Sequence, residues 1–105
     1  MRFTAGVGKI LEASDFPEMR KPSFKIKVDF GKEIGVKTSS VGAVGAHSKE
    51  ELKDMLVCCV VTFPPKRVAN FDSEVLTLGF RNNSGTGWIL ITPSKTNVDI
   101  GSKLA

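Results

Sequence analysis

The chain has 105 residues, 41% of them hydrophobic and 25% charged, which is an ordinary composition for one compact globular domain. No apolar run approaches the roughly 20 residues that a membrane-spanning helix needs, and the first eight residues lack the apolar core of a signal peptide, so we expect neither membrane insertion nor export. The formal net charge of +4 permits an anionic partner without requiring one.

Short strands separated by turns are predicted for the first part of the chain. Residues 7–13 are expected to form a first strand. In residues 24–30 apolar side chains alternate strictly with polar ones, so that Lys25 and Lys27 share one face and the apolar residues share the other. Glycines at 31 and 35 predict a turn, after which residues 34–40 are expected to return as a third strand.

One helix is predicted in the middle of the chain, over residues 49–55. Ser48 is followed three residues later by Glu51, which is the spacing of a capping box. Leu52 and Leu56 lie one helical turn apart and are expected to face inward.

The remaining segments are predicted to be strands. Residues 56–63 are almost wholly apolar, which favours a buried strand, and Pro64 and Pro65 end it because consecutive prolines cannot continue a ladder. Further strands are expected over residues 74–80 and 87–92, the last of which carries Trp88.

Three strands, a helix and then at least two strands is the element order of an OB-fold. The chain is therefore predicted to be all-β with one short helix, a five-stranded Greek-key barrel with an added C-terminal strand, forming a single domain over residues 1–105. Such barrels bind ligands on one face and on the loops that follow strand 1 and join strands 4 and 5.

The two predicted ligand loops, residues 14–23 and 64–73, have similar chemistry. Each has an aromatic residue and proline followed by two adjacent cations: Phe16-Pro17 with Arg20-Lys21, and Phe63-Pro64-Pro65 with Lys66-Arg67. Cations of this kind contact phosphates, exposed rings stack on unpaired bases, and proline lowers the entropy that a loop loses on binding. Two alternatives stay open, namely that the rings plug the barrel and that the cation pairs are solvated turns. Lys37, Ser39 and Ser40 are expected to extend the face of Lys25 and Lys27.

No other residue pattern predicts catalysis or metal binding. Cys58 and Cys59 are adjacent, so on a strand they point to opposite faces, and we expect reduced thiols rather than a disulfide or a metal site. The single histidine, His47, is expected to be a loop residue. The carboxylates form no clear acid–base pair, so the chain is not expected to be an enzyme, and no cofactor or metal is predicted.

The residues also resemble a known family. The run FPPKRVANFDSEVLTLG (residues 63–79) matches the pattern of the tRNA-binding-domain family at nearly every position, and residues 15–18 and 28–31 add to the match. Within that family the chain is most similar to the CsaA-like branch. The resemblance implies an OB-fold, a homodimer without catalytic activity, and binding of tRNA by shape and backbone rather than by base sequence. A cytoplasmic location is expected from the reduced thiols. It also implies an alternative, a peptide-binding chaperone for unfolded or export precursor polypeptides that uses the same surface.

The expected ligand surface combines these residues. Those predicted to bind tRNA or another structured RNA are Arg20, Lys21, Lys25, Lys37, Ser39, Ser40, Lys66, Arg67 and Ser73, and those predicted to contact a polypeptide are Phe63, Pro64, Pro65 and Phe71. The chain departs from the family pattern at Thr38, Thr62 and Asn70, where relatives usually carry glutamine, asparagine and glycine. The first two changes remove amide groups from the expected face.

Overall fold

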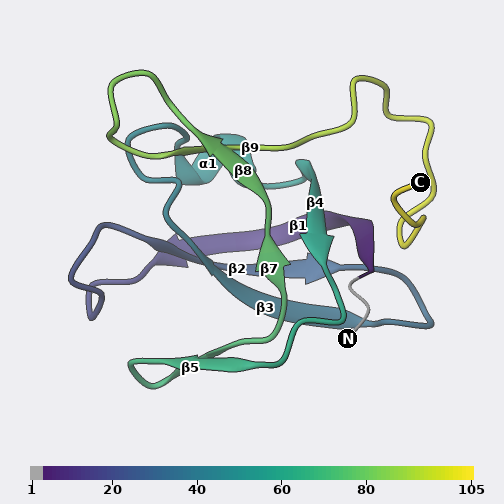
Figure 1. Ribbon diagram of the computed structural model, residues 1–105, viewed down its shortest axis with the longest axis horizontal. Coiled ribbons are helices and arrows are strands. Elements are labelled where there is room, and N and C mark those ends of the chain that lie inside the picture. Colours follow the sequence, from purple (N-terminus) through teal and green to yellow (C-terminus); the bar gives the residue numbers. More distant parts are fainter. Residues whose placement is uncertain (1–3) are drawn as a thin grey trace.

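Five antiparallel strands curl into a nearly closed barrel of the OB type, as the element order predicts (Figure 1). The computed structural model describes residues 4–105. Its main sheet has the order β3-β2-β1-β4-β7. The strands are β1 (Ala5–Asp15), β2 (Phe24–Asp29), β3 (Val36–Val41), β4 (Leu56–Val60) and β7 (Leu76–Thr77).

The core lies inside this barrel, and the alternation of apolar and polar residues in β2 determines which of its side chains are buried there. Ile26 and Val28 are almost completely buried, while Lys27 between them is exposed. The side chains of Val28 and Phe30 pack so closely against Gly8 of β1 that a Cβ at this position would collide with both. Glycine therefore leaves the room that these two core side chains occupy.

Side chains, rather than a backbone ladder, close the barrel between β3 and β7. These two strands are the edges of the main sheet. The Ser39 hydroxyl donates to the Val75 carbonyl (3.1 Å), and the Thr77 hydroxyl donates to Ser39 Oγ (2.9 Å). Ser39 is fully buried, so these hydrogen bonds satisfy a polar group that would otherwise be costly inside a core.

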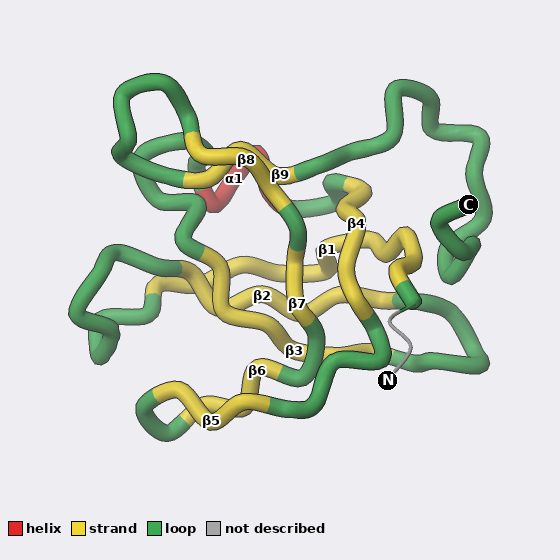
Figure 2. Tube along the Cα trace, viewed as in Figure 1, coloured by secondary structure: helices red, strands yellow, loops and turns green. Residues whose placement is uncertain are grey.

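A helix and two hairpins are added to the barrel (Figure 2). The helix is α1 (Lys49–Leu52), and the hairpins are β5 (Lys66–Val68) with β6 (Phe71–Ser73), and β8 (Gly79–Arg81) with β9 (Trp88–Leu90). Figure 2 shows the two hairpins at opposite ends of the view, β5 and β6 below and β8 and β9 above. The C-terminal segment returns to β1, where Gly101 N donates to Val7 O (2.7 Å). In residues 4–105 no helix has the length and apolar character needed to cross a membrane.

Some sequence-based boundaries are wrong. The predicted loop over residues 64–73 is the β5–β6 hairpin, and the predicted strand over residues 74–80 is divided into β7 and β8. The helix ends at Leu52 rather than at residue 55, because Lys53 is already extended and Asp54 has a φ of 68°. Leu56 therefore begins β4, which itself ends at Val60 and not at residue 63.

Candidate nucleic-acid interface

An aromatic–cation cluster lies where the β1–β2 loop meets the β5–β6 hairpin. We call Phe16, Lys25 and Phe71 the ring cluster. The Lys25 ammonium lies 4.8 Å from the centre of the Phe16 ring and 5.6 Å from that of Phe71. The two rings meet edge to face, with centres 5.4 Å apart and an interplanar angle of 68°. Phe16 is 3% exposed and acts as a packed plug, whereas Phe71 is half-buried, so Phe71 is the ring that a ligand can reach.

The β5–β6 hairpin is held on the outer face of β3 mainly through Thr38. The Thr38 hydroxyl lies 2.8 Å from the Asp72 carbonyl oxygen and 2.9 Å from a Glu74 carboxylate oxygen. The Thr38 backbone N–H also donates to that carboxylate (3.0 Å), and Glu74 N returns a hydrogen bond to Thr38 O (2.8 Å). Ser40 N donates to Ser73 Oγ (3.2 Å). The residue that replaces the family's usual amide at position 38 therefore orients the hairpin.

The cations of this surface differ in whether a carboxylate neutralises them. Arg67 forms an ion pair across the hairpin with Asp72 (2.8 Å), and Lys27 pairs with Glu12 (3.4 Å). Within residues 4–105 the following predicted ligand cations form no such pair: Arg20, Lys21, Lys25, Lys37 and Lys66. Their charge remains available to a phosphate.

The structure divides the residues predicted for the strand face between two faces. Ser40 lies opposite Lys25, and Thr38 lies opposite Lys27, so these four share the outer face. Ser39 lies opposite Ile26, and its burial removes it from any ligand. Lys37 lies opposite Val28, so it too projects from the core side of the sheet, because directly paired residues share a face.

The other predicted positions lie near the hairpin. Ser73 is 7% exposed and accepts the hydrogen bond from Ser40 N, so it supports the hairpin. Pro64 and Pro65 are exposed and Phe63 is half-buried, just before β5.

Comparison with known proteins shows the family of the chain. The family model described as "Putative tRNA binding domain" matches residues 6–103. The chain belongs to this tRNA-binding-domain family. Two solved structures, a CsaA chaperone protein from Picrophilus torridus and chaperone CsaA from Bacillus anthracis str. Ames, are 43% and 36% identical, each with a TM-score of 0.88. The matches cover 99% and 98% of this chain and 92% and 91% of theirs.

A curated relative is an enzyme. The methionine–tRNA ligase of Pyrococcus horikoshii is 34% identical over 98 residues, which are 93% of this chain. The chain spans only 13% of the length of that ligase. The matched family itself is a binding domain and not a catalytic one.

Two residues of this tRNA-binding domain that sequence reasoning did not select lie together on the β8–β9 hairpin. The Arg81 guanidinium lies 5.3 Å from the centre of the Trp88 ring, and the two residues are paired across the strands. Trp88 is 42% exposed, which is unusual for the chain's single tryptophan. The sequence signal was an aromatic residue directly after the polar segment 82–87. Only the structure shows that this residue is exposed and that Arg81 is its partner.

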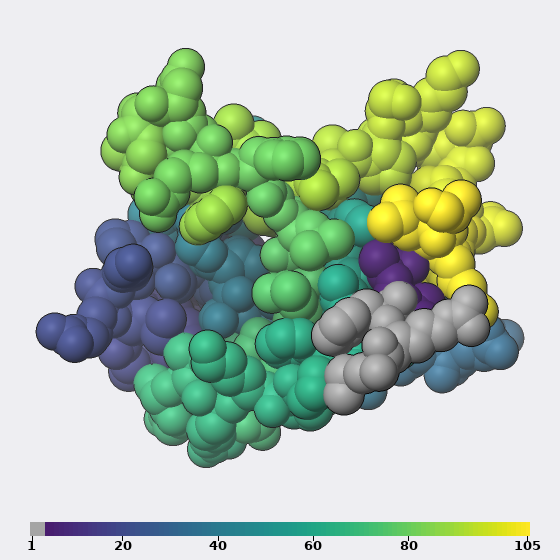
Figure 3. Space-filling view, in the orientation of Figure 1, coloured from purple at the N-terminus to yellow at the C-terminus, as the bar shows by residue number. Residues whose placement is uncertain are grey.

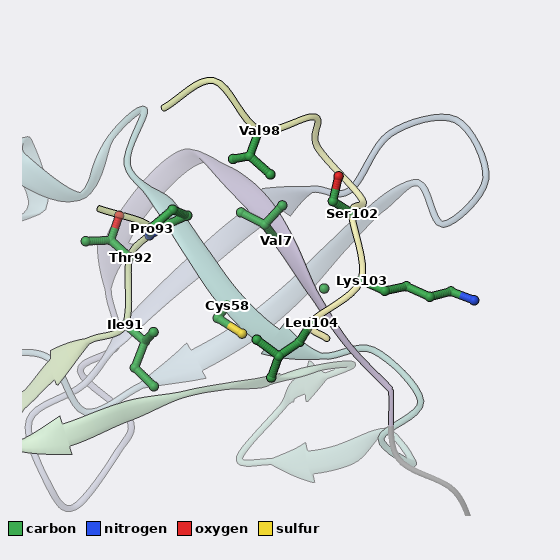
Figure 4. A pocket seen from close by; sticks show the side chains of 10 residues that line it. Val7, Cys58, Ile91, Thr92, Pro93, Val98, Ser102, Lys103 and Leu104 are labelled. Carbon is green, nitrogen blue, oxygen red and sulfur yellow. The ribbon is translucent and has the colours of Figure 1, made fainter. Parts of the chain in front are cut away.

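An apolar pocket of about 230 Å³ lies between the start of β1 and the C-terminal segment (Figure 4). Figure 4 shows Cys58, Val7 and Leu104 around it.

Cys58 and Cys59 are both buried and free, as predicted. Burial raises the pKa of Cys58 and raises that of Cys59 to about 12, although the Thr77 hydroxyl near Cys59 opposes the shift. In residues 4–105 no three His, Cys, Asp or Glu side chains gather in a way that could hold a metal ion.

Proposed function

We propose that this chain is a non-enzymatic tRNA-binding protein that recognises structured RNA by shape and backbone. The observation that carries the proposal is the ring cluster, in which Lys25 lies over two rings and, within residues 4–105, pairs with no carboxylate. The membership of the tRNA-binding-domain family supports it. Lys25 and Lys66 would contact phosphates, and Phe71 would stack on an unpaired base.

The ion pairs refine which cations contribute most. Arg67 forms an ion pair with Asp72, so an RNA phosphate has to compete with that carboxylate. Within residues 4–105 no carboxylate pairs with Lys25 or Lys66, so a phosphate that binds them displaces no such partner. We therefore assign the larger share of the phosphate contacts to Lys25 and Lys66.

The test is the salt dependence of tRNA binding. For the native chain we expect log affinity to fall with log salt with a slope of about −2 to −4, because several bound counterions are released. Lys25→Met should weaken binding to all tRNAs alike and make the slope shallower by about 1. Fluorescence anisotropy of labelled bulk tRNA, measured at several salt concentrations, gives both quantities.

Lys95→Met is the control, since it also removes one lysine charge but does so at an exposed site in the C-terminal segment. It should leave affinity and slope almost unchanged. Equal effects of the two substitutions, or binding that salt does not weaken, would contradict the proposal.

A second candidate is a peptide-binding chaperone that uses the same surface. It is supported by the chaperone relatives that are 36% and 43% identical over nearly their whole length. The exposed prolines 64 and 65, with Phe63 and Phe71, would supply the apolar contacts. In that case Phe71→Ser abolishes the suppression of aggregation of a heat-denatured client, while Lys25→Met leaves this suppression intact.

We also propose that the protein is cytoplasmic and self-associates. The two free thiols support a reducing compartment. Leu104 is 66% exposed beside the apolar pocket at Val7 and Cys58, and a second copy is the occupant that would cover it. Small domains commonly cover remaining apolar surface in this way.

A further inference from the structure

A second pocket lies between the β1–β2 loop and the β8–β9 hairpin. In Figure 3 the hairpin is the green lobe at the upper left, and the loop is the blue lobe below it. The pocket has a volume of about 340 Å³, and small-molecule sites begin at about 300 Å³. Lys21 lines it from the loop, and Arg81 and Trp88 line it from the hairpin. We call it the Trp88 pocket.

The Trp88 ring is a fixed wall of this pocket. Trp88 N donates to Gly42 O (3.0 Å), which ties the hairpin to the segment after β3. A Cβ at Gly42 would lie 3.0 Å from Trp88 Cδ1, so the indole edge rests directly on the backbone. The ring nevertheless remains 42% exposed, which leaves an aromatic surface open to a ligand.

The turn of the hairpin is held in place by Asn82. Its side-chain oxygen accepts hydrogen bonds from Thr86 N (2.9 Å) and Gly87 N (3.2 Å), and its Nδ2 donates to the Thr86 hydroxyl (3.0 Å). Gly87 is packed against the Val44 carbonyl so closely that no side chain fits there. A pocket whose walls are ordered before binding loses little entropy when a ligand enters.

The charge of the pocket selects an anion. Among the described residues 4–105, Lys21 and Arg81 are the only charged ones that line it, and none of its lining residues is a carboxylate. Within residues 4–105 neither cation forms an ion pair. An exposed indole beside two unneutralised cations matches a flat aromatic group that carries a phosphate, which is the chemistry of a nucleotide. A polypeptide segment without carboxylates would use the ring but would leave both charges without a partner.

We propose that the Trp88 pocket receives one unpaired nucleotide of the bound RNA, with its base on the indole and its phosphate between Lys21 and Arg81. The proposal rests on the proposed RNA-binding function and extends it from the surface around Phe71 to a separate nucleotide site on the β8–β9 hairpin. Every base has a flat face, so the pocket accepts any base that is free to stack.

The single tryptophan makes the pocket directly observable, because all intrinsic tryptophan emission comes from Trp88. We expect tetra-adenylate to quench this emission saturably and a blunt RNA duplex without unpaired bases to quench it far less. Lys21→Met and Arg81→Met should weaken the binding of tetra-adenylate several-fold while keeping the indole as the probe. Trp88→Leu should weaken it about tenfold, as anisotropy of the labelled oligonucleotide reports.

Lys95→Met is again the control and should change neither readout. Tight, salt-dependent tRNA binding with unchanged Trp88 emission would overturn the proposed nucleotide site in the Trp88 pocket, while the proposed RNA-binding function would stand. Quenching by tetra-adenylate without any tRNA binding would overturn the function and retain a nucleotide site. Quenching by a proline-rich peptide, but not by tetra-adenylate, would overturn the proposal in favour of a polypeptide site. If Trp88→Leu fails to fold, the affinity of Lys21→Met and Arg81→Met for tetra-adenylate decides whether the proposal holds.

Discussion

At the scale of single residues, burial controls the chemistry of the two thiols on β4. Cys59 is fully buried, and its pKa is raised to about 12 from an ordinary value of 9.0. Between pH 9 and about pH 12 the folded chain therefore keeps the thiol proton that the unfolded chain releases. Stability from this thiol is complete below pH 9 and is lost as the pH rises toward about 12, by at most about 1.4 kcal/mol per pH unit.

Urea unfolding at about pH 8 and about pH 10 measures this loss. Cys59→Val, which keeps a small apolar side chain, should lose less of its free energy of unfolding between the two pH values than the native chain does. All other titratable groups are the same in the two proteins, so the comparison isolates the Cys59 thiol. An identical loss in the two proteins would show that Cys59 does not titrate differently on unfolding.

At the scale of elements, the helix is only four residues long and depends on its cap. Ser48 Oγ accepts from Glu51 N (3.1 Å), and Glu51 Oε1 accepts from Ser48 N (3.0 Å). The neighbouring His47 links the cap to β9, because its Nε2 accepts a hydrogen bond from Leu90 N (3.1 Å). The cap thus joins the helix to β9.

Ser48→Ala should lower the free energy of unfolding by about 1 kcal/mol, since a short helix has few other contacts to compensate. Urea unfolding measures the change. Ser94→Ala, at an exposed site in the C-terminal segment, is the matched control and should be nearly neutral. Equal stabilities of the two variants would mean that the capping box contributes nothing.

At the scale of the whole molecule, self-association should depend on the C-terminal segment. Leu104→Glu places a charge beside the apolar pocket and should shift a dimer to a monomer in sedimentation experiments. Val36→Glu, at a comparably exposed apolar site on β3, should leave the dimer intact. A monomeric native chain, or loss of the dimer only with Val36→Glu, would refute this interface.

The alternation in residues 24–30, the capping box at Ser48 and the order of elements predicted the barrel, the helix start and the face of Lys25. These patterns are local, since a strand's period of two and a cap's spacing of three are carried by neighbouring residues. The run over residues 63–79 likewise pointed to the family, through its match to the family's pattern, without any contact being known.

The sequence by itself therefore determined the fold class, the family and the presence of basic loops. Only the tertiary structure decided which of these residues work together. It buried Ser39 by closing the barrel onto β7, paired Arg67 with Asp72 across the β5–β6 hairpin, and brought Lys21 to one pocket with Trp88. The physical reason is that strand register and loop docking depend on contacts between residues far apart in the chain, which no local pattern encodes.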